Sequence, residues 1–235
     1  MQSKQVSLMF SGGLDSTTAA LNLAQEYDKV HLLTYYNGHG HFYINNSAKR
    51  AKELSDRFSG KFTHSIISIE EIFKDMVLDK LSQDYKEYKS GFIWCLGCKM
   101  CMHARSIVYN LQNNISSMAD GSSADSDEMV EQMGLSVSLI AIFYEKYKIN
   151  YFVPVYKETR EEKIKKLKGM GFRMGLRIGN RFLGVQPKCV PGELYYMPYL
   201  LFNKALEHEK HLVTKFIKEK SQSADQYIKG CLKNG

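Results

Sequence analysis

The chain has 235 residues, 44% of them hydrophobic and 24% charged, which permits one large α/β domain or one domain with a small appendage. Its first five residues are polar and no apolar run is long enough to span a membrane, so we expect a cytoplasmic protein without a membrane partner. The formal net charge of +7 favours an anionic ligand, such as a nucleotide or a nucleic acid.

Short apolar runs alternate with helix-forming segments along the chain. The apolar runs predict strands at residues 6–10, 29–36, 62–69, 114–123 and 149–155. Apolar spacing predicts helices at 17–25 and 45–58. Two capping boxes, Ser68 with Glu71 and Thr159 with Glu162, predict the start of two more helices. This alternation predicts right-handed βαβ units and a Rossmann-like parallel sheet of about five strands with helices on both faces.

The chain becomes helical and charged from about Pro198. We therefore expect residues 1–197 to form the α/β domain, including the cysteine-rich segment, and residues 198–235 to form a helical C-terminal appendage. The appendage is expected to pack on the domain or on a second subunit of a homodimer.

The first predicted strand is followed by the segment SGGLDST, Ser11 to Thr17, which leads directly into a helix. Ligands of open α/β sheets bind beyond the carboxyl ends of the strands, and a helix N-terminus there offers free N–H groups to phosphate. Gly12 and Gly13 allow close approach of the backbone, and Ser11, Ser16 and Thr17 add hydroxyl donors.

Asp15 is the unusual member of this segment, because a carboxylate beside phosphates is repulsive unless Mg²⁺ lies between them. The P-loop pattern GxxxxGK[ST] is absent and GxGxxG is not found at this loop. The plain alternative is a tight turn that caps a helix, but the strand–loop–helix context favours a phosphate site.

The sequence SGGLDSTTAA resembles the SGGxDS signature of the PP-loop ATP pyrophosphatases. That group includes tRNA thiolation enzymes, 7-cyano-7-deazaguanine synthase and the sulfur insertase of lactate racemase maturation. The resemblance covers roughly Val6 to Pro191. It implies a five-stranded parallel sheet, a loop that binds the pyrophosphate of ATP, and attack of a substrate oxygen on the α-phosphate. The products are an adenylated intermediate and pyrophosphate, and a second nucleophile then displaces AMP.

The segment MADGSSADSDEMVEQ resembles a later strand-end loop of the same family. The resemblance implies that Asp120, Gly121 and Asp125 face the nucleotide. From the residues alone, Asp125 could equally cap a following helix, with Glu128 completing a capping box.

Three cysteines, Cys95, Cys98 and Cys101, recur at three-residue intervals in WCLGCKMCMH, and Cys189 is the next cysteine. On a helix this spacing places the three on one face. They could be buried thiols that act as small hydrophobes, four ligands of a structural Zn²⁺, or three ligands of a [4Fe–4S] cluster with one open iron.

The family resemblance favours the cluster. Several cluster-dependent thiolation enzymes carry CxxC after the third strand and one cysteine about ninety residues later, a layout that Cys95, Cys98 and Cys189 match. A metal-free persulfide relay between Cys98 and Cys189 is a further option, and Cys101 is additional to the pattern. Lys99 and Arg105 flank the cysteines and could hold phosphate or lie on a solvated helix face.

We therefore predict an ATP-dependent adenylating enzyme, a sulfurtransferase that acts on a tRNA base or a small molecule and takes sulfur from a donor protein. Asp15, Cys98 and Cys189 are the predicted catalytic residues. One alternative is an adenylating amidase or ligase of the 7-cyano-7-deazaguanine synthase type with structural zinc. A non-catalytic ATP-binding protein is the other.

Overall fold

A five-stranded parallel sheet is the centre of the molecule in a computed structural model, which describes residues 3–126, 128–178, 181–183, 186–202 and 206–233. The strands of the sheet are β1 (Gln5–Met9), β2 (Lys29–Tyr36), β4 (Phe62–Ser68), β5 (Ser117–Ala119) and β6 (Asn150–Phe152). Their spatial order is β4-β2-β1-β5-β6, and every pairing is parallel. The α/β sheet expected from the sequence is confirmed.

The strand order reverses once, between β1 and β5. From β1 the chain proceeds outward through β2 to β4, and it then returns to place β5 on the other side of β1. Such a reversal leaves the loops after β1 and β5 free of a crossing connection, and ligands of open α/β sheets bind at that point. The fold therefore marks the loops after Met9 and Ala119 as the position of a site.

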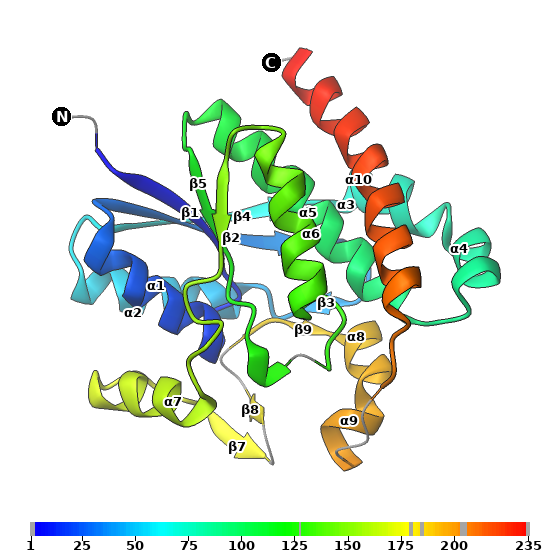
Figure 1. Ribbon diagram of the computed structural model, residues 1–235. Coiled ribbons are helices and arrows are strands. Elements are labelled where there is room, and N and C mark those ends of the chain that lie inside the picture. Colours follow the sequence, from blue (N-terminus) through cyan, green and yellow to red (C-terminus); the bar gives the residue numbers. More distant parts are fainter. Residues whose placement is uncertain (1–2, 127, 179–180, 184–185, 203–205, 234–235) are drawn as a thin grey trace.

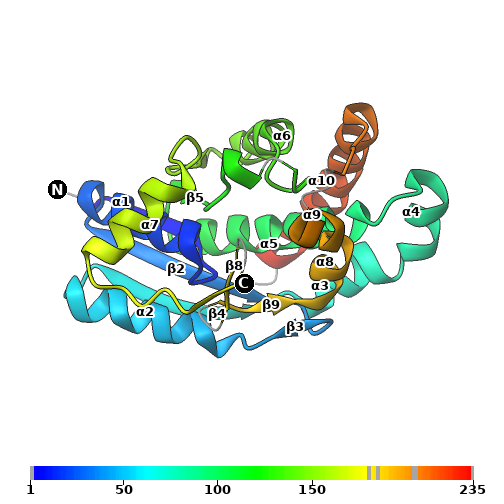
Figure 2. The same cartoon turned by 90° about the horizontal axis from the view of Figure 1, so that it is seen from below.

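Helices cover both faces of the sheet (Figures 1 and 2). The helices are α1 (Leu14–Glu26), α2 (Asn45–Arg57), α3 (Glu70–Phe73), α4 (Leu81–Tyr88), α5 (Phe92–Gln112), α6 (Gly134–Glu145), α7 (Arg160–Gly169), α8 (Val190–Tyr195), α9 (Met197–Phe202) and α10 (Lys210–Lys233). A π-helical turn spans Lys74–Leu78 and a 3₁₀ turn spans Ala124–Ser126.

Alternation along β1 divides the core into two clusters. Val6 and Leu8 face α1, α2 and α7, whereas Met9 faces the helices α3, α5, α6 and α10. Successive strand residues point to opposite faces, so a strand buried on both sides reads as a continuous apolar run. This explains why the strands are recognisable in the sequence without clear alternation.

Two small sheets accompany the main one. The strands β3 (His41–Phe42) and β9 (Lys188–Cys189) pair antiparallel, with His41 opposite Cys189. The strands β7 (Leu176–Ile178) and β8 (Arg181–Leu183) form a second antiparallel pair. Figure 1 shows β9, α8 and α9 together at the bottom of the view, away from the C-terminal end of α10. The β3–β9 pair brings a late segment of the chain onto the loop that follows β2.

The two predicted capping boxes have different outcomes. Thr159 and Glu162 form the reciprocal pair at the start of α7, so this prediction is confirmed. The predicted box of Ser68 and Glu71 does not form, because Ser68 still belongs to β4 and its hydroxyl accepts from Glu70 N instead, although a helix begins at Glu70 as expected. The helix begins at Glu70 with Ile69 as its N-cap, so Ser68 and Glu71 each lie one position too early to form the box.

The C-terminal helix α10 packs against α5 and α6 and contributes apolar side chains such as Phe216 to the core cluster of that face. Its buried Lys220 donates to Asp84 at 2.6 Å and to the carbonyl of Met76 at 2.7 Å. The helix thus packs on the domain itself, which is one of the two arrangements expected from the sequence. The boundary at residue 198 stays a prediction. Among the helices that the structure describes, none combines the length and apolar character that crossing a membrane requires.

Candidate functional site

The loop after β1 turns sharply into α1. Gly12 has a φ of 75°, a left-handed conformation that a side chain disfavours, and Gly13 is the residue that precedes the helix. The first backbone hydrogen bond of the helix runs from Thr17 N to Gly13 O. The N–H groups of residues 14–16 therefore have no acceptor within the helix and are available to an anion.

The hydroxyl groups of this loop are placed unequally. Ser11 Oγ lies 3.2 Å from Ser16 Oγ and accepts from Gly13 N at 3.3 Å. Thr17 is completely buried, and its Oγ1 has no hydrogen-bond partner among the described residues. The structure therefore places Ser11 and Ser16 together at the helix start, but it holds the predicted Thr17 hydroxyl inside the protein.

Two glycines let other segments approach the loop. A Cβ on Gly121, in the loop after β5, would lie 2.9 Å from the backbone nitrogen of Ser16. A Cβ on Gly13 would lie 2.0 Å from Oε1 of Gln186, in the segment before β9. The contact at Gly121 is with backbone, so packing around the helix start requires a glycine there, whereas the Gln186 side chain that meets Gly13 can move aside.

Lys163 of α7 joins the two loops. Its Nζ lies 2.7 Å from Asp15 Oδ1, 2.6 Å from Ser123 Oγ and 3.5 Å from Asp125 Oδ2. The Lys163 side chain is 1% exposed, whereas the side chains of Asp15 and Asp125 are 32% and 40% exposed. One buried ammonium thus gathers two accessible carboxylates beside the free N–H groups of α1. We call Ser11–Ser16, Gly121, Ser123, Asp125 and Lys163 the switch-point site.

Asp120 is turned inward, away from this site. Its carboxylate is completely buried, pairs with Lys99 Nζ at 2.7 Å and accepts from Ser122 N and Tyr151 Oη. Lys99 and these hydrogen bonds hold the pKa of Asp120 far below its usual range although burial opposes that shift. Asp120 therefore shapes the loop after β5 instead of facing the nucleotide as the resemblance implied, and Asp125 is the carboxylate that reaches the surface.

The segment around Asp125 also differs from the alternative expectation of a helix cap. Ala124–Ser126 is a single 3₁₀ turn, and α6 begins only at Gly134. Neither Asp125 nor Glu128 lies at the start of that helix, and residue 127 is outside the described residues. The side chain of Asp125 is thus left beside Lys163.

Cys95, Cys98 and Cys189 come together at the start of α5, where β9 crosses. The Sγ atoms of Cys189 and Cys95 lie 3.4 and 3.5 Å from the position that a Cβ on Gly192 would occupy. Cys98 Sγ accepts from Asn37 Nδ2 at 3.5 Å and lies 4.0 Å from His41 Nε2. We call Cys95, Cys98 and Cys189 the cysteine cluster.

Cys101 does not share this arrangement. It is completely buried, and its Sγ contacts the carbonyl oxygen of Ile72 at 3.7 Å. Each three-residue step on a helix turns the side chain by about 60° relative to the last, so two steps move Cys101 away from the direction of Cys95. The expected common face holds for Cys95 and Cys98 and is lost at Cys101.

Burial dominates the electrostatics of the thiols. It raises the pKa of Cys95 and Cys98 well above the ordinary thiol value, and that of Cys189 as well. The carboxylate of Glu131 raises the pKa of all three further, and neighbouring thiols add to the shift at Cys95 and Cys98. Burial lowers the pKa of His41 to about 4, so this imidazole is neutral at physiological pH. The cluster is therefore uncharged in the thiol form.

Thiols that gather from two segments are suitable donors for a soft metal or an iron–sulfur cluster. Among the residues that the structure describes, however, no group of three His, Cys, Asp or Glu side chains is already arranged around one ion position. The donor types fit a thiolate-bound group, and the three sulfur atoms would have to draw closer to hold it.

Several of these residues were missed by the sequence reasoning. Lys163 lies in a lysine-rich helix whose composition resembles a solvated face. Only its position four residues after the N-cap Thr159 indicates that it lies near the start of the helix, close to the edge of the sheet. Glu131 and Asn37 lie in segments without a motif. Lys99 was noted as a phosphate candidate, but the structure pairs it with Asp120.

One solved structure aligns over nearly the whole chain with a TM-score above 0.5. A 4-thiouridine synthetase in complex with RNA and bound ATP matches 97% of this chain and 53% of its own, with a TM-score of 0.53 and 14% identity. The chain thus spans about half the length of that protein. At this identity the likeness is one of fold, and at that level the resemblance seen in the sequence is confirmed.

Two further structures align less well. A predicted tRNA methyltransferase subunit from Methanocaldococcus jannaschii covers 70% of this chain and 74% of its own, with a TM-score of 0.47 and 19% identity. An NMN synthetase from Francisella tularensis matches 95% of this chain and 87% of its own, with a TM-score of 0.49 and 11% identity. No protein-family model matches the sequence.

Proposed function

We propose that the protein binds ATP at the switch-point site and transfers its adenylyl group to a substrate oxygen, releasing pyrophosphate. One observation carries this proposal: the glycine loop Ser11–Ser16, the loop after β5 and Lys163 meet where the strand order reverses. Free N–H groups, hydroxyls and an ammonium in one place suit a polyphosphate. The sequence motif SGGLDS lies at that position and gives the reaction type by resemblance.

Each group has a role in this proposal. The N–H groups at the start of α1, with Ser11 and Ser16, hold the departing pyrophosphate. Asp15 and Asp125 are the accessible carboxylates that would bind Mg²⁺ between them and the phosphates. Lys163 keeps these carboxylates in place before ATP binds and neutralises phosphate charge afterwards.

The adenylyl transfer balances without another reactant. A substrate carbonyl oxygen attacks the α-phosphorus, the bond from that phosphorus to the bridging oxygen breaks, and pyrophosphate leaves with the electron pair. A nucleophile then attacks the activated carbon, and AMP leaves with the former carbonyl oxygen. We propose that the nucleophile is sulfur, because two members of the cysteine cluster, Cys95 and Cys98, lie on α5, the helix that also carries Lys99, the partner of Asp120.

The cysteine cluster would hold a [4Fe–4S] group through Cys95, Cys98 and Cys189, and such a group supplies an open iron that delivers sulfide. The placement of Cys101 against Ile72 supports three ligands over a four-thiolate zinc site. A direct persulfide relay between Cys98 and Cys189 uses the same residues without metal. The zinc-containing amidase or ligase is the second candidate, and it requires Cys101 to join the other three.

We propose a base in RNA or a small molecule with the same carbonyl chemistry as the substrate. The 4-thiouridine synthetase that shares this fold is described in complex with RNA, and the net charge of +7 suits a polyanionic partner. A separate protein would supply the sulfur. The cytoplasm is the proposed location.

Analysis of the nucleotide products tests the proposal directly. Purified protein with ATP, Mg²⁺, bulk tRNA and sodium sulfide as the sulfur source should form AMP and pyrophosphate, and Asp15→Ala should abolish this while circular dichroism stays unchanged. Asp28→Ala, a surface change away from the site, is the matched control and should turn over normally. Formation of ADP and phosphate, or normal turnover by Asp15→Ala, would contradict the adenylyl-transfer mechanism. ATP binding without any turnover would favour the non-catalytic alternative.

Replacement of each cysteine separates the candidate roles of the cluster. After anaerobic reconstitution, Cys95→Ser, Cys98→Ser and Cys189→Ser should lose iron, sulfide and the broad visible absorbance of a thiolate-bound cluster, whereas Cys101→Ser should keep them. Zinc held in aerobic protein and lost equally in all four variants would decide for the structural zinc site.

A further inference from the structure

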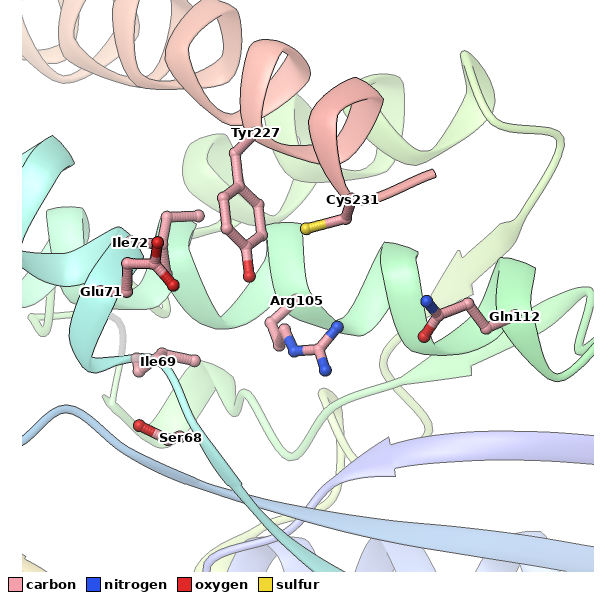
Figure 3. Close-up of a pocket in the computed structure, with 8 residues that line it drawn as sticks. All are labelled: Ser68, Ile69, Glu71, Ile72, Arg105, Gln112, Tyr227 and Cys231. Carbon is pink, nitrogen blue, oxygen red and sulfur yellow. The ribbon is translucent and has the colours of Figure 1, made fainter. Parts of the chain in front are cut away.

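A cleft separate from the switch-point site lies between α3, α5 and α10, beside the edge strand β4 (Figure 3). Its volume is about 380 Å³, which lies within the range of small-molecule pockets. The residues that line it are Ser68, Ile69, Glu71, Ile72, Arg105, Gln112, Tyr227 and Cys231. Arg105 lies ten residues along α5 from Cys95, or about 15 Å at the helical rise, so the cleft is distinct from the cysteine cluster.

Arg105 is the cation of this cleft. Its side chain is partly buried, yet it makes no ion pair and no hydrogen bond with any other residue that the structure describes. Figure 3 shows its guanidinium group pointing into the open space below Tyr227. A guanidinium carries five N–H donors in a fork that fits a carboxylate or a phosphate, and such groups are seldom withdrawn from water unpaired. The free fork in a concave site indicates an anionic ligand group.

Glu71 brings the opposite charge to the same cleft. Its exposed carboxylate makes no ion pair or hydrogen bond within the described part of the chain, and it is not within salt-bridge distance of Arg105. Both charges act on the Tyr227 phenol: burial raises its pKa to about 12, Arg105 opposes this shift and Glu71 adds to it. The two charges thus lie on either side of the phenol without neutralising each other.

The remaining lining suits a ligand of modest size. Gln112 points its amide toward Arg105, and Tyr227 directs its hydroxyl into the same space (Figure 3). Ile69 and Ile72 are buried side chains that give the cleft an apolar wall. The cleft therefore offers a cation, an anion, the uncharged polar groups of Ser68, Gln112 and Tyr227, and a short apolar surface.

We infer that this cleft binds a free amino acid or a similar small zwitterion, with the ligand carboxylate on Arg105 and the ligand ammonium on Glu71. A carboxylate in the fork of Arg105 can accept two parallel hydrogen bonds, and an ammonium at Glu71 makes a charge-assisted bond. A phosphate ester or another polyanion fits less well, because Glu71 repels it. The apolar wall of Ile69 and Ile72 accepts a side chain.

Ligand-observed NMR with the full-length protein and each common L-amino acid as probe tests this inference, followed by calorimetric titration of the strongest binder. Acetate, ethylamine and inorganic phosphate serve as single-charge or polyanion probes. The variants are Arg105→Gln and Glu71→Gln. Lys218→Gln, an exposed position on α10, and Glu145→Gln, an exposed position on α6, remove the same charges outside the cleft. Circular dichroism checks the fold of every variant.

The inference predicts that at least one amino acid binds with one-to-one stoichiometry and competes with neither ATP nor Mg²⁺. Arg105→Gln and Glu71→Gln each weaken this binding by at least about tenfold, whereas Lys218→Gln and Glu145→Gln leave it unchanged. Nucleotide turnover stays normal in all four variants, so failure here leaves the adenylyl-transfer proposal untouched. Absence of binding by every amino acid, or stronger binding of phosphate by Glu71→Gln than of any amino acid by the unaltered protein, would overturn the zwitterion site.

Discussion

The switch-point site and the cysteine cluster lie near the carboxyl edge of the same sheet, but their electrostatics are opposite. At the switch-point site, charges are already paired: Lys163 contacts Asp15 and Asp125. At the cysteine cluster, burial and Glu131 keep the thiols protonated. The first site is organised before its ligand arrives, whereas the second acquires charge only when a cation or a reaction partner removes protons.

In the proposed reaction, this difference would let the two sites act one after the other. A preset cation and a helix N-terminus bind a polyphosphate without further rearrangement, which suits the first step of an adenylyl transfer. Protonated thiols are weak nucleophiles, so they do not attack ATP or oxidise readily before the substrate is activated. Variants that remove the preset charge or the burial should therefore affect the two sites in different ways.

Removal of the preset cation should have the largest effect. Lys163→Ala leaves Asp15 and Asp125 facing the phosphates without a neutralising partner, so ATP turnover should fall by at least about 100-fold. Lys165→Ala, an exposed position on the same helix, removes an equal charge and should turn over normally. Steady-state release of pyrophosphate measures both. Equal activity of the two variants would show that the contact of Lys163 with both loops has no part in the reaction.

The buried pair that supports the loop after β5 should affect stability more than chemistry. Lys99→Met leaves the Asp120 carboxylate buried without its partner, and the free energy of unfolding should drop by about 3 kcal/mol. Denaturant unfolding followed by circular dichroism measures this loss. The double variant Lys99→Met with Asp120→Asn should recover part of the stability, because the amide is uncharged and still accepts from Ser122 N. If Lys99→Met leaves the free energy of unfolding unchanged, water reaches the Asp120 carboxylate.

The order of strands and helices could be predicted from the sequence because apolar runs and helix spacing are local signals. The loop Ser11–Ser16 was found for the same reason, since its residues are contiguous. The capping box at Thr159 was also readable, whereas that at Ser68 failed because Ser68 pairs with β2 and α3 begins one residue later than the box requires, with Ile69 as its N-cap. Local chemistry predicts well wherever no tertiary partner competes for the residue.

The partners of the site could not be predicted in this way. Lys163 reaches Asp15 across 148 positions of sequence, and no local pattern distinguishes it from Lys165 on the same helix. The inward turn of Asp120 depends on Lys99 and Tyr151, which lie on two other elements. Cys101 matches the sequence spacing of its neighbours, and only the helix rotation and the contact with Ile72 separate it from them.

The protonated state of the cysteine cluster predicts slow alkylation. Iodoacetamide reacts with the thiolate, so each unit by which the pKa is raised slows the reaction by about tenfold at a fixed pH. Cys98 and Cys101, which are also buried, should be labelled more slowly than Cys95 and Cys189. Peptide mass spectrometry over a time course gives the order. Rapid labelling of Cys98 in the folded protein would show that its thiol is not buried and protonated, and would remove the contrast between the cysteine cluster and the switch-point site.

Acid should produce the smallest effect, through the neutral histidines that adjoin the two regions. Burial lowers the pKa of His41 to about 4, and burial with Lys99 lowers that of His103 to about 3, whereas both have a value of 6.5 when unfolded. Between pH 6.5 and about 4 the unfolded chain binds more protons than the folded one. Stability is therefore complete above pH 6.5 and decreases as the pH falls through this window.

The slope of unfolding free energy with pH is at most about 1.4 kcal/mol per pH unit for each histidine. Glu131 acts in the opposite sense, because burial raises its pKa and the folded state holds its proton longer. His103→Gln should reduce the slope, whereas His211→Gln, at an exposed position, should leave it unchanged. Denaturant unfolding at several pH values measures these slopes. If the free energy of unfolding is flat or rises on acidification, His103 is charged in the folded state and pairs with Asp120, 3.9 Å away. His103 and Asp120, which support the loop after β5 at the switch-point site, would then share one proton.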